Sequence, residues 1–173
     1  MAPLEADAPL VGAAEDRMSA LIGALWNIGV RITLASGAIG APLVIRFDAP
    51  SAGASTLARV ALDLGAGAHL AVVEEIAGAP APAGVARALL AATSEVTLGA
   101  GARLDLSSIQ QLPEDRAYIV VRHHDFGAGA TMHLAAAQIG ARLVRGRIDH
   151  LLRGDGATIR QVEVVFGSGD QLH

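Results

Sequence analysis

The sequence has no cysteine, no lysine and few aromatic residues, which make up 3% of the chain. Without cysteine it can form no disulfide, no thiolate zinc site and no cysteine nucleophile. Its 13 basic residues, all arginine, stand against 17 acidic ones, and no basic block is present. The electrostatic footprint of a nucleic-acid-binding protein is therefore missing. At 52% hydrophobic residues the chain is too apolar to be disordered, so its core must consist of Ala, Val, Leu and Ile.

Export and membrane signals are also missing. The first ten residues, MAPLEADAPL, carry acids where a signal peptide has a basic region. The longest apolar stretch, residues 21–47, is interrupted by Asn27, Arg31 and Arg46 and predicts no membrane span. We therefore expect a soluble cytoplasmic protein. Residues 1–28 are interpreted as a loose arm with a short helix over 13–26, and residues 29–173 as the core.

One short motif, Gly-x-Gly-Ala followed by a polar and an apolar residue, occurs four times. The copies are LGAGAHL, LGAGARL, FGAGATM and RGDGATI, and their first glycines are Gly65, Gly99, Gly127 and Gly154. A weaker fifth copy, GSGDQL, follows at residues 167–172. The constant polar–apolar order predicts that a strand begins after each motif in the same register, with one face outward and one inward.

The intervals between these glycines, 34, 28 and 27 residues, each hold two strand-like runs, such as residues 103–110 and 117–124. Residues 29–34 and 42–47 form an earlier pair. Such a period indicates a stacked repeat. The chain could be an antiparallel meander of hairpins or a β-solenoid; the lack of Asn-Gly favours the solenoid. Residues 77–84 are expected to form a loop insertion, and residues 85–93 fit either a helix or a strand.

The glycines themselves have two interpretations. A sharp turn needs positive φ angles that a Cβ resists. A phosphate-binding loop, the alternative, would require each motif to open a helix after a strand. Strands follow here, so we interpret the motif as a turn.

The candidate metal ligands are His123, His124 and His133. His123 and Asp125 share one face of a strand, and His124 points to the other. A metal site would need a further ligand from a stacked turn, for which His133 or His150 is available. The alternative is that these are solvent-facing strand residues. His69 and His133 lie close to turns and are expected at the surface.

No catalytic constellation emerges from the sequence. Glu74 and Glu75 point to opposite faces of a strand and cannot flank one bond as a glycosidase pair does. One of them could point inward, but we expect the pair to end a strand in solvent. Ser107 and Ser108 have no histidine or acid at a recognisable spacing, and no nucleophile elbow is present. We expect no enzymatic activity.

The order of segments resembles the core of the SufB/SufD family of iron–sulfur cluster assembly proteins, from about Leu21 to His173. ALWNIGVRITLASGAIGAPLVIRF, TLARVALDLGAGAHLAVVEE and SEVTLGAGARLDLSSIQQLPEDRAYIVV each resemble successive parts of that core. The most specific resemblance is to the family pattern G-x-x-x-x-R-x-x-I-x-x-x-L-x-G-x-G-A. This chain matches it at Gly140, Arg145, Ile148, Leu152, Gly154, Gly156 and Ala157. The resemblance implies a right-handed parallel β-helix.

The resemblance also implies a role. Family members are non-catalytic scaffolds in which a SufB-like and a SufD-like subunit pair and bind the ATPase SufC. Iron or an iron–sulfur cluster belongs to the full complex, and this segment is expected to bind no cofactor itself. SufB-type members carry a cysteine shortly after the glutamate at the end of the first turn, where this chain has Ile76, so it is SufD-like. It lacks the family's later turns and helical tail, so we interpret it as truncated at its C-terminal end. A stand-alone solenoid for interactions or carbohydrate binding is the alternative.

Overall fold

The computed structural model describes residues 17–49, 54–81 and 88–173, which form one helix and ten strands in two sheets. The helix is α1 (Arg17–Leu25). The first sheet, called the odd sheet here, contains β1 (Ile28–Leu34), β3 (Thr56–Leu64), β5 (Ala88–Leu98), β7 (Arg116–Phe126) and β9 (Leu143–Leu152). The second, the even sheet, contains β2 (Leu43–Ala49), β4 (His69–Gly78), β6 (Arg103–Gln111), β8 (Thr131–Ile139) and β10 (Thr158–Phe166).

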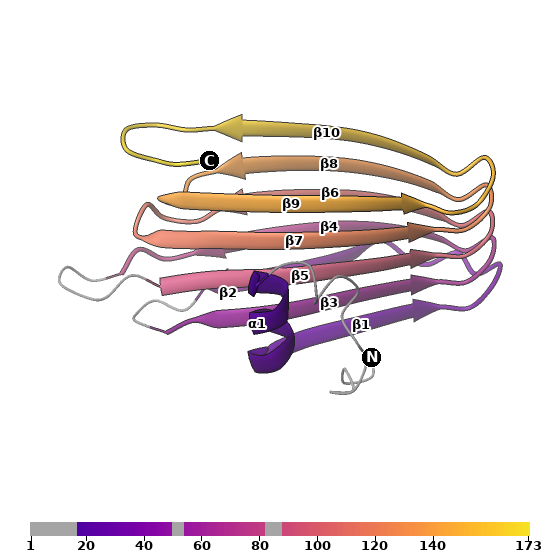
Figure 1. Ribbon diagram of the computed structural model, residues 1–173, viewed down its shortest axis with the longest axis horizontal. Helices are drawn as coiled ribbons and strands as arrows, with labels where there is room; N and C mark the ends of the chain where they lie inside the picture. The colour runs from indigo at the N-terminus through magenta and orange to yellow at the C-terminus, as the bar shows by residue number, and fades with distance from the viewer. Residues whose placement is uncertain (1–16, 50–53, 82–87) are drawn as a thin grey trace.

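The two sheets form a parallel β-solenoid of about five turns, each turn contributing one odd and one even strand (Figure 1). Every pairing between these strands is parallel. Consecutive strands lie in different sheets, so none of them forms a hairpin. The prediction of a solenoid is confirmed, and the antiparallel meander is wrong.

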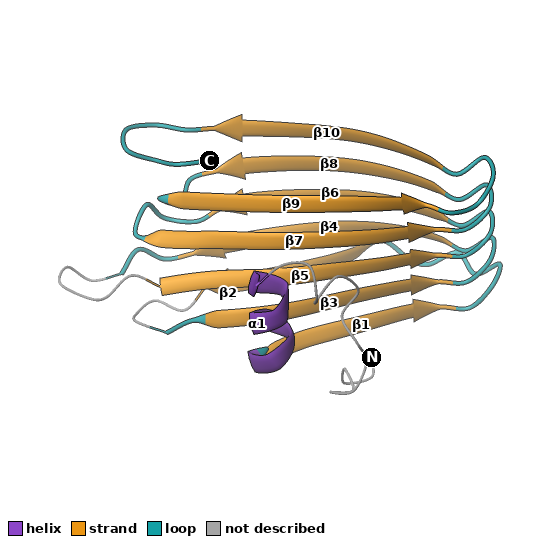
Figure 2. Cartoon of the chain, viewed as in Figure 1, coloured by secondary structure: helices purple, strands orange, loops and turns teal. Residues whose placement is uncertain are grey.

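The Gly-x-Gly motifs are the turns that carry the chain from the odd to the even sheet, and they stack at one end of the solenoid (Figure 2). Their two glycines have different tasks. A Cβ at the first glycine of the second copy, Gly99, would lie 2.6 Å from the backbone nitrogen of Ala66 in the turn below. The second glycine, Gly101, has a φ of 66°, in the left-handed region that glycine tolerates. One glycine thus permits close stacking, and the other permits the bend.

The fifth copy is not part of this stack. Residues 167–172 follow β10, a strand of the even sheet, whereas the four other copies follow strands of the odd sheet. The segment therefore turns at the opposite end of the solenoid, where Leu172 bridges to Leu143 at the start of β9. The sequence motif repeats, but its place in the turn does not.

The interior between the two sheets, called the lumen here, is filled by alternate residues of each strand. The apolar sixth residues of the motif, Leu70, Leu104 and Met132, are buried and stack in register. Ile159 continues the row and packs against the same core. The polar residue before each of them faces outward, so the predicted register is confirmed.

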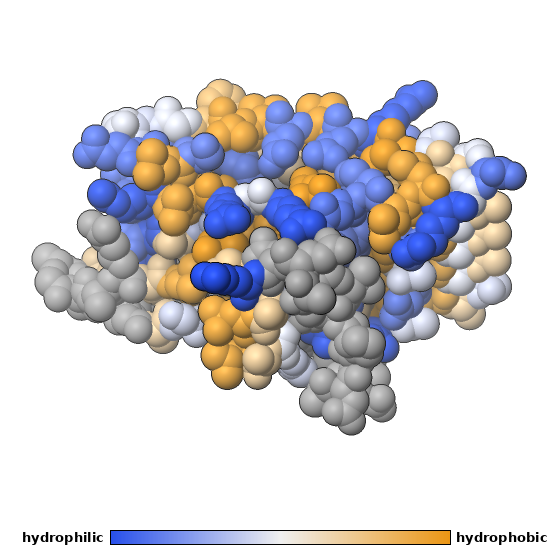
Figure 3. All heavy atoms as spheres, viewed as in Figure 1, coloured by the Kyte–Doolittle hydropathy of each residue, from blue (hydrophilic) through white to orange (hydrophobic). Residues whose placement is uncertain are grey.

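The outer face of the odd sheet carries the helix and several ion pairs. Ile22 of α1 is buried against Leu57 and Ala91, whereas Leu25 is exposed. Elsewhere on this side, hydrophilic and hydrophobic side chains interleave (Figure 3). One of the ion pairs is between Arg31 and Asp63, which lie 3.6 Å apart.

Two sequence ambiguities fall on partly described segments. Residues 85–93 form a strand from Ala88 onward, and residues 85–87 lie outside the described residues. The loop expected over residues 77–84 begins only at residue 79, because Ala77 and Gly78 still belong to β4, and residues 82–84 lie outside the described residues. In the described part of the chain, no helix combines the length and apolarity needed to cross a bilayer.

Candidate functional site

A group of charged and polar side chains interrupts the apolar lumen. Arg122 of β7 donates a 2.7 Å hydrogen bond to Glu74 Oε2 of β4 and a 2.9 Å hydrogen bond to Ser108 Oγ of β6. These bonds cross from the odd to the even sheet. Arg122 and Glu74 are both buried, and so is Tyr118, four residues before Arg122 on the same face of β7.

The charges of this group are fixed by their surroundings. Burial alone would lower the pKa of Arg122, but Glu74, Tyr118 and Glu163 together outweigh it and raise that pKa, so the guanidinium stays charged. Burial raises the pKa of Tyr118 to about 12, which keeps its hydroxyl protonated at neutral pH. The group is therefore a matched, desolvated ion pair and offers no activated nucleophile.

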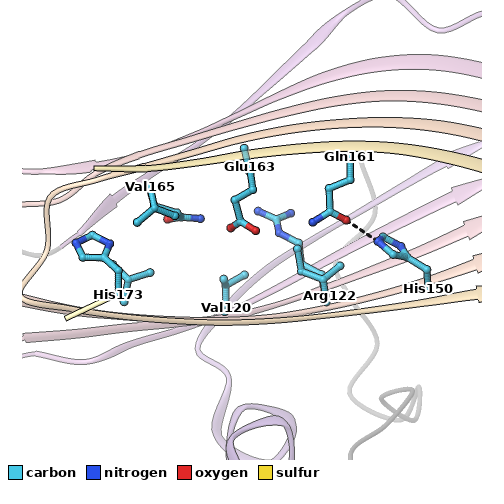
Figure 4. Close-up of a pocket in the computed structure, with 12 residues that line it drawn as sticks. Val120, Arg122, His150, Gln161, Glu163, Val165 and His173 are labelled. Atoms are coloured by element: carbon cyan, nitrogen blue, oxygen red, sulfur yellow. Dashed lines mark hydrogen bonds between the residues drawn. The ribbon is translucent and has the colours of Figure 1, made fainter. Parts of the chain in front are cut away.

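Beyond Arg122 the lumen opens into a cavity of about 370 Å³. Its polar lining residues are Arg122, Gln138, His150, Gln161, Glu163 and His173. In Figure 4 the Glu163 carboxylate and the Arg122 guanidinium face each other across this space. The cavity thus presents imidazole, amide, carboxylate and guanidinium groups together.

His124 and His150 meet beside this cavity. The parallel register places them opposite each other on β7 and β9, and their Nδ1 atoms are 3.0 Å apart. His150 Nε2 lies 2.8 Å from Gln161 Oε1, the hydrogen bond dashed in Figure 4. Burial lowers the pKa of His124 to about 3, with smaller contributions from the charge of Arg122 and from His150. His124 is thus a neutral imidazole at pH 7.

The other two candidate histidines lie elsewhere. His123 is on the outer face of the odd sheet, where its Nδ1 lies 3.3 Å from Asp149 Oδ2. His133 is on the outer face of the even sheet and contacts Asp105, which also contacts His69. The structure therefore separates the three histidines: His123 is on the outer face of the odd sheet, His124 is in the lumen, and His133 is on the outer face of the even sheet. Among the described residues, no group of three or more His, Asp or Glu side chains could hold a metal ion.

Several expectations from the sequence need correction. His123 and His124 are buried and do not face solvent. Glu74 is inside the lumen, and only Glu75 faces outward, 3.8 Å from Arg46. The expectation of a solvent-exposed glutamate pair is therefore wrong for Glu74. His69 and His133 are at the surface, as predicted, with about two-fifths of each side chain exposed.

Sequence reasoning missed the Arg122–Glu74 pair, although a signal for it was present. Glu74 lies between Val72 and Ile76 at alternate positions, and both of these are buried in the core. Alternate residues of a strand point to the same face, so a charged residue that alternates with buried apolar residues must also point into the lumen. Its partner could not be found in this way, because it comes from another turn.

Comparison with known families shows to which family the chain belongs. A family model described as "SUF system FeS cluster assembly, SufBD core domain" matches residues 47–173, well over half of the chain. The chain belongs to the SufBD core family. No significant match is found among curated proteins or among solved structures.

The polar features of the lumen all lie within the matched SufBD core, which extends from Phe47 near the middle of β2 through β10. Ile76, at the position where the resemblance places a cysteine in SufB-type members, is buried in an apolar cluster with Leu90 and Tyr118. This SufBD core therefore has a hydrocarbon side chain packed at that point.

Proposed function

We propose that this protein is a SufD-like scaffold subunit of a cytoplasmic iron–sulfur cluster assembly complex. In this proposal it has no catalytic activity, pairs with a SufB-like subunit and acts with a SufC-like ATPase. Its membership of the SufBD core family supports a role in cluster assembly. The choice of a SufD-like role rests on one observation, the absence of cysteine from the whole chain.

Sulfur is carried on proteins as a persulfide or a thiolate, both of which require a cysteine side chain. A chain without cysteine cannot accept sulfur in this way, and the buried Ile76 offers no substitute. The scaffold role requires no such chemistry. It requires a rigid surface, which stacked parallel strands provide along their length.

The lumen also supports a non-catalytic role, because its buried charges are paired with each other. Arg122 is already bonded to Glu74 and Ser108, so its strongest interactions are satisfied within the protein. A buried, paired charge of this kind is a structural element rather than an acid or base poised near neutral pH.

The proposal is tested by deleting the gene in its own organism and measuring the activity of a [4Fe–4S] enzyme in cell extracts. We expect activity to fall and to return when the gene is restored. Because no step uses a thiol of this protein, a restored gene encoding Ile76→Val should work as well as the wild type. Unchanged enzyme activity after deletion would contradict the proposal. It would favour the alternative of a stand-alone solenoid for interactions or carbohydrate binding.

A further inference from the structure

The lumen brings two imidazole nitrogens together at hydrogen-bond distance. His124 and His150 occupy the same position on adjacent parallel strands, so both side chains enter the lumen at one level. Their Nδ1 atoms are 3.0 Å apart, and the ring centroids are 4.9 Å apart. His124 is fully buried, whereas His150 lines the cavity.

The hydrogen bonds assign the protons. The amide oxygen of Gln161 can only accept, so His150 Nε2 carries a proton and donates it. The two Nδ1 atoms, 3.0 Å apart, form a hydrogen bond only if one carries a proton and the other a lone pair. With Nε2 of His150 donating to Gln161, Nδ1 of His150 supplies that lone pair, and Nδ1–H of His124 donates to it. Only one proton occupies the space between the two rings.

We propose that His124 and His150 form a two-histidine binding site for a divalent transition-metal ion of the zinc or ferrous class. In a tetrahedral site, two imidazole nitrogens at about 2.0–2.1 Å from the metal are separated by roughly 3.3 Å. The observed separation is 3.0 Å, so admitting the ion takes a shift of a few tenths of an ångström together with a turn of both rings that aims their Nδ1 lone pairs at one common point. Imidazole is a ligand suited to zinc, iron, nickel and copper.

Metal binding at this point requires His124 to change tautomer. Its proton moves from Nδ1 to Nε2, and the ring stays neutral. Nε2 of His124 is buried and has no hydrogen-bond partner, so the change breaks one hydrogen bond, that between the two rings, and moves the proton to a nitrogen without an acceptor. Gln161 meanwhile holds His150 in the orientation and tautomer that a metal ligand needs, as second-shell partners of histidine ligands do.

The remaining coordination positions face the cavity. Because no third His, Asp or Glu of the described chain completes the site, water or an incoming ligand would fill them. Such an open site suits exchangeable binding rather than a structural metal. The nearby positive charge of Arg122 is balanced by Glu74 and faces Glu163, so it leaves the cavity without a large excess of positive charge. The inference goes beyond the proposed scaffold role and does not depend on it.

The test is titration of the chelator-treated protein with Co²⁺, followed by visible absorption, and with Zn²⁺, followed by calorimetry. We expect the wild type to bind one ion per chain. His150→Ala should weaken binding at least tenfold, because a main ligand is lost. Gln161→Leu should weaken it by roughly tenfold and should retain measurable binding, whereas His150→Ala should reduce binding to background, because Gln161→Leu removes only the group that orients His150.

Two histidine variants serve as matched controls. His133→Ala removes an exposed histidine of the even sheet, and His173→Ala removes the other histidine of the cavity. Both should bind metal like the wild type, and circular dichroism should show all variants folded. The site is wrong if the wild type binds no metal. It is equally wrong if His150→Ala retains full affinity, or if His133→Ala or His173→Ala abolishes binding.

Discussion

The Arg122 guanidinium lies 2.7 Å from the Glu74 carboxylate inside the solenoid, although the two residues are 48 positions apart in the chain. Only 2% of the Arg122 side chain and 4% of the Glu74 side chain are exposed. Two full charges have thus been removed from water and compensate each other. Removing one of them leaves the other buried and unpaired.

Glu74→Gln should therefore destabilise the protein strongly. We expect the free energy of unfolding in urea to fall by roughly 3–5 kcal/mol, the usual result of breaking a buried ion pair. Glu75→Gln is the matched control, because this neighbouring carboxylate lies on the outer face and should cost less than about 1 kcal/mol. Equal effects of the two variants would show that the charge of Glu74 is not buried.

Replacing both partners should be better tolerated than replacing one. The double variant Glu74→Leu with Arg122→Met leaves no unpaired charge and keeps the lumen filled. Its loss of unfolding free energy should be smaller than that of either single replacement. Additive losses would contradict a direct interaction between the two side chains.

Alanine substitutions at the two turn glycines, Gly99 and Gly101, should destabilise the protein for different reasons. Gly99→Ala places a Cβ 2.6 Å from the Ala66 nitrogen and should cost about 1–3 kcal/mol of stability, as overpacking does. Gly101→Ala meets no atom within 4 Å but has a φ of 66°, so it should cost about 1–2 kcal/mol. Gly101→Asn should cost less than Gly101→Ala, because asparagine tolerates the left-handed region better.

Gly146 in β9 is the control for both turn glycines. A Cβ there would lie 3.8 Å from Val120 Cγ1, an ordinary contact, and its φ is not positive. Gly146→Ala should leave the denaturation midpoint unchanged or raise it slightly. A loss as large as that of Gly99→Ala would show that stacking distance is not what the motif protects.

Because of Asp105, part of the free energy of unfolding should depend on pH in the acid range. Partial burial raises the pKa of this carboxyl, but hydrogen bonds from Arg103, His69 and His133 outweigh it and hold the pKa below the ordinary 3.8. The unfolded chain therefore takes up the proton first as pH falls. The contribution of Asp105 is complete above about pH 5 and is lost as pH falls through the folded-state pKa.

The corresponding measurement compares Asp105→Asn with the wild type in urea at pH 7 and near pH 3. About a third of the side chain is exposed, so we expect a loss of at most about 1 kcal/mol at pH 7. That difference should shrink at pH 3. Asp155→Asn, in an exposed turn, serves as the control. A difference between Asp105→Asn and the wild type that grows in acid would reverse the assigned sign.

The sequence predicted the solenoid because its determinants are local. The turn glycines and the polar–apolar order after them, as in His69–Leu70 and Arg103–Leu104, fix the bend and the face of each strand. The fifth copy, residues 167–172, misled for the same reason. A local pattern does not reveal which of the two sheets precedes it.

The contacts of the candidate site could not be predicted from local sequence patterns. Parity placed His123 and His124 on opposite faces, but it could not say that His124 would meet His150 while His123 would meet Asp149. Those partners depend on the register between β7 and β9, which the intervening turns set. The same holds for Asp105, which joins His69 and His133 across three turns of the even sheet.

The most direct test of the scaffold proposal is the mass of the native complex. The protein is expressed from its own gene, together with the SufB-like and SufC-like proteins of its organism, and the affinity-purified material is weighed by native mass spectrometry. The proposal predicts an assembly that contains this protein, a SufB-like subunit and SufC-like ATPase. If the protein is recovered alone while the SufB-like and SufC-like proteins assemble without it, the proposed role is contradicted.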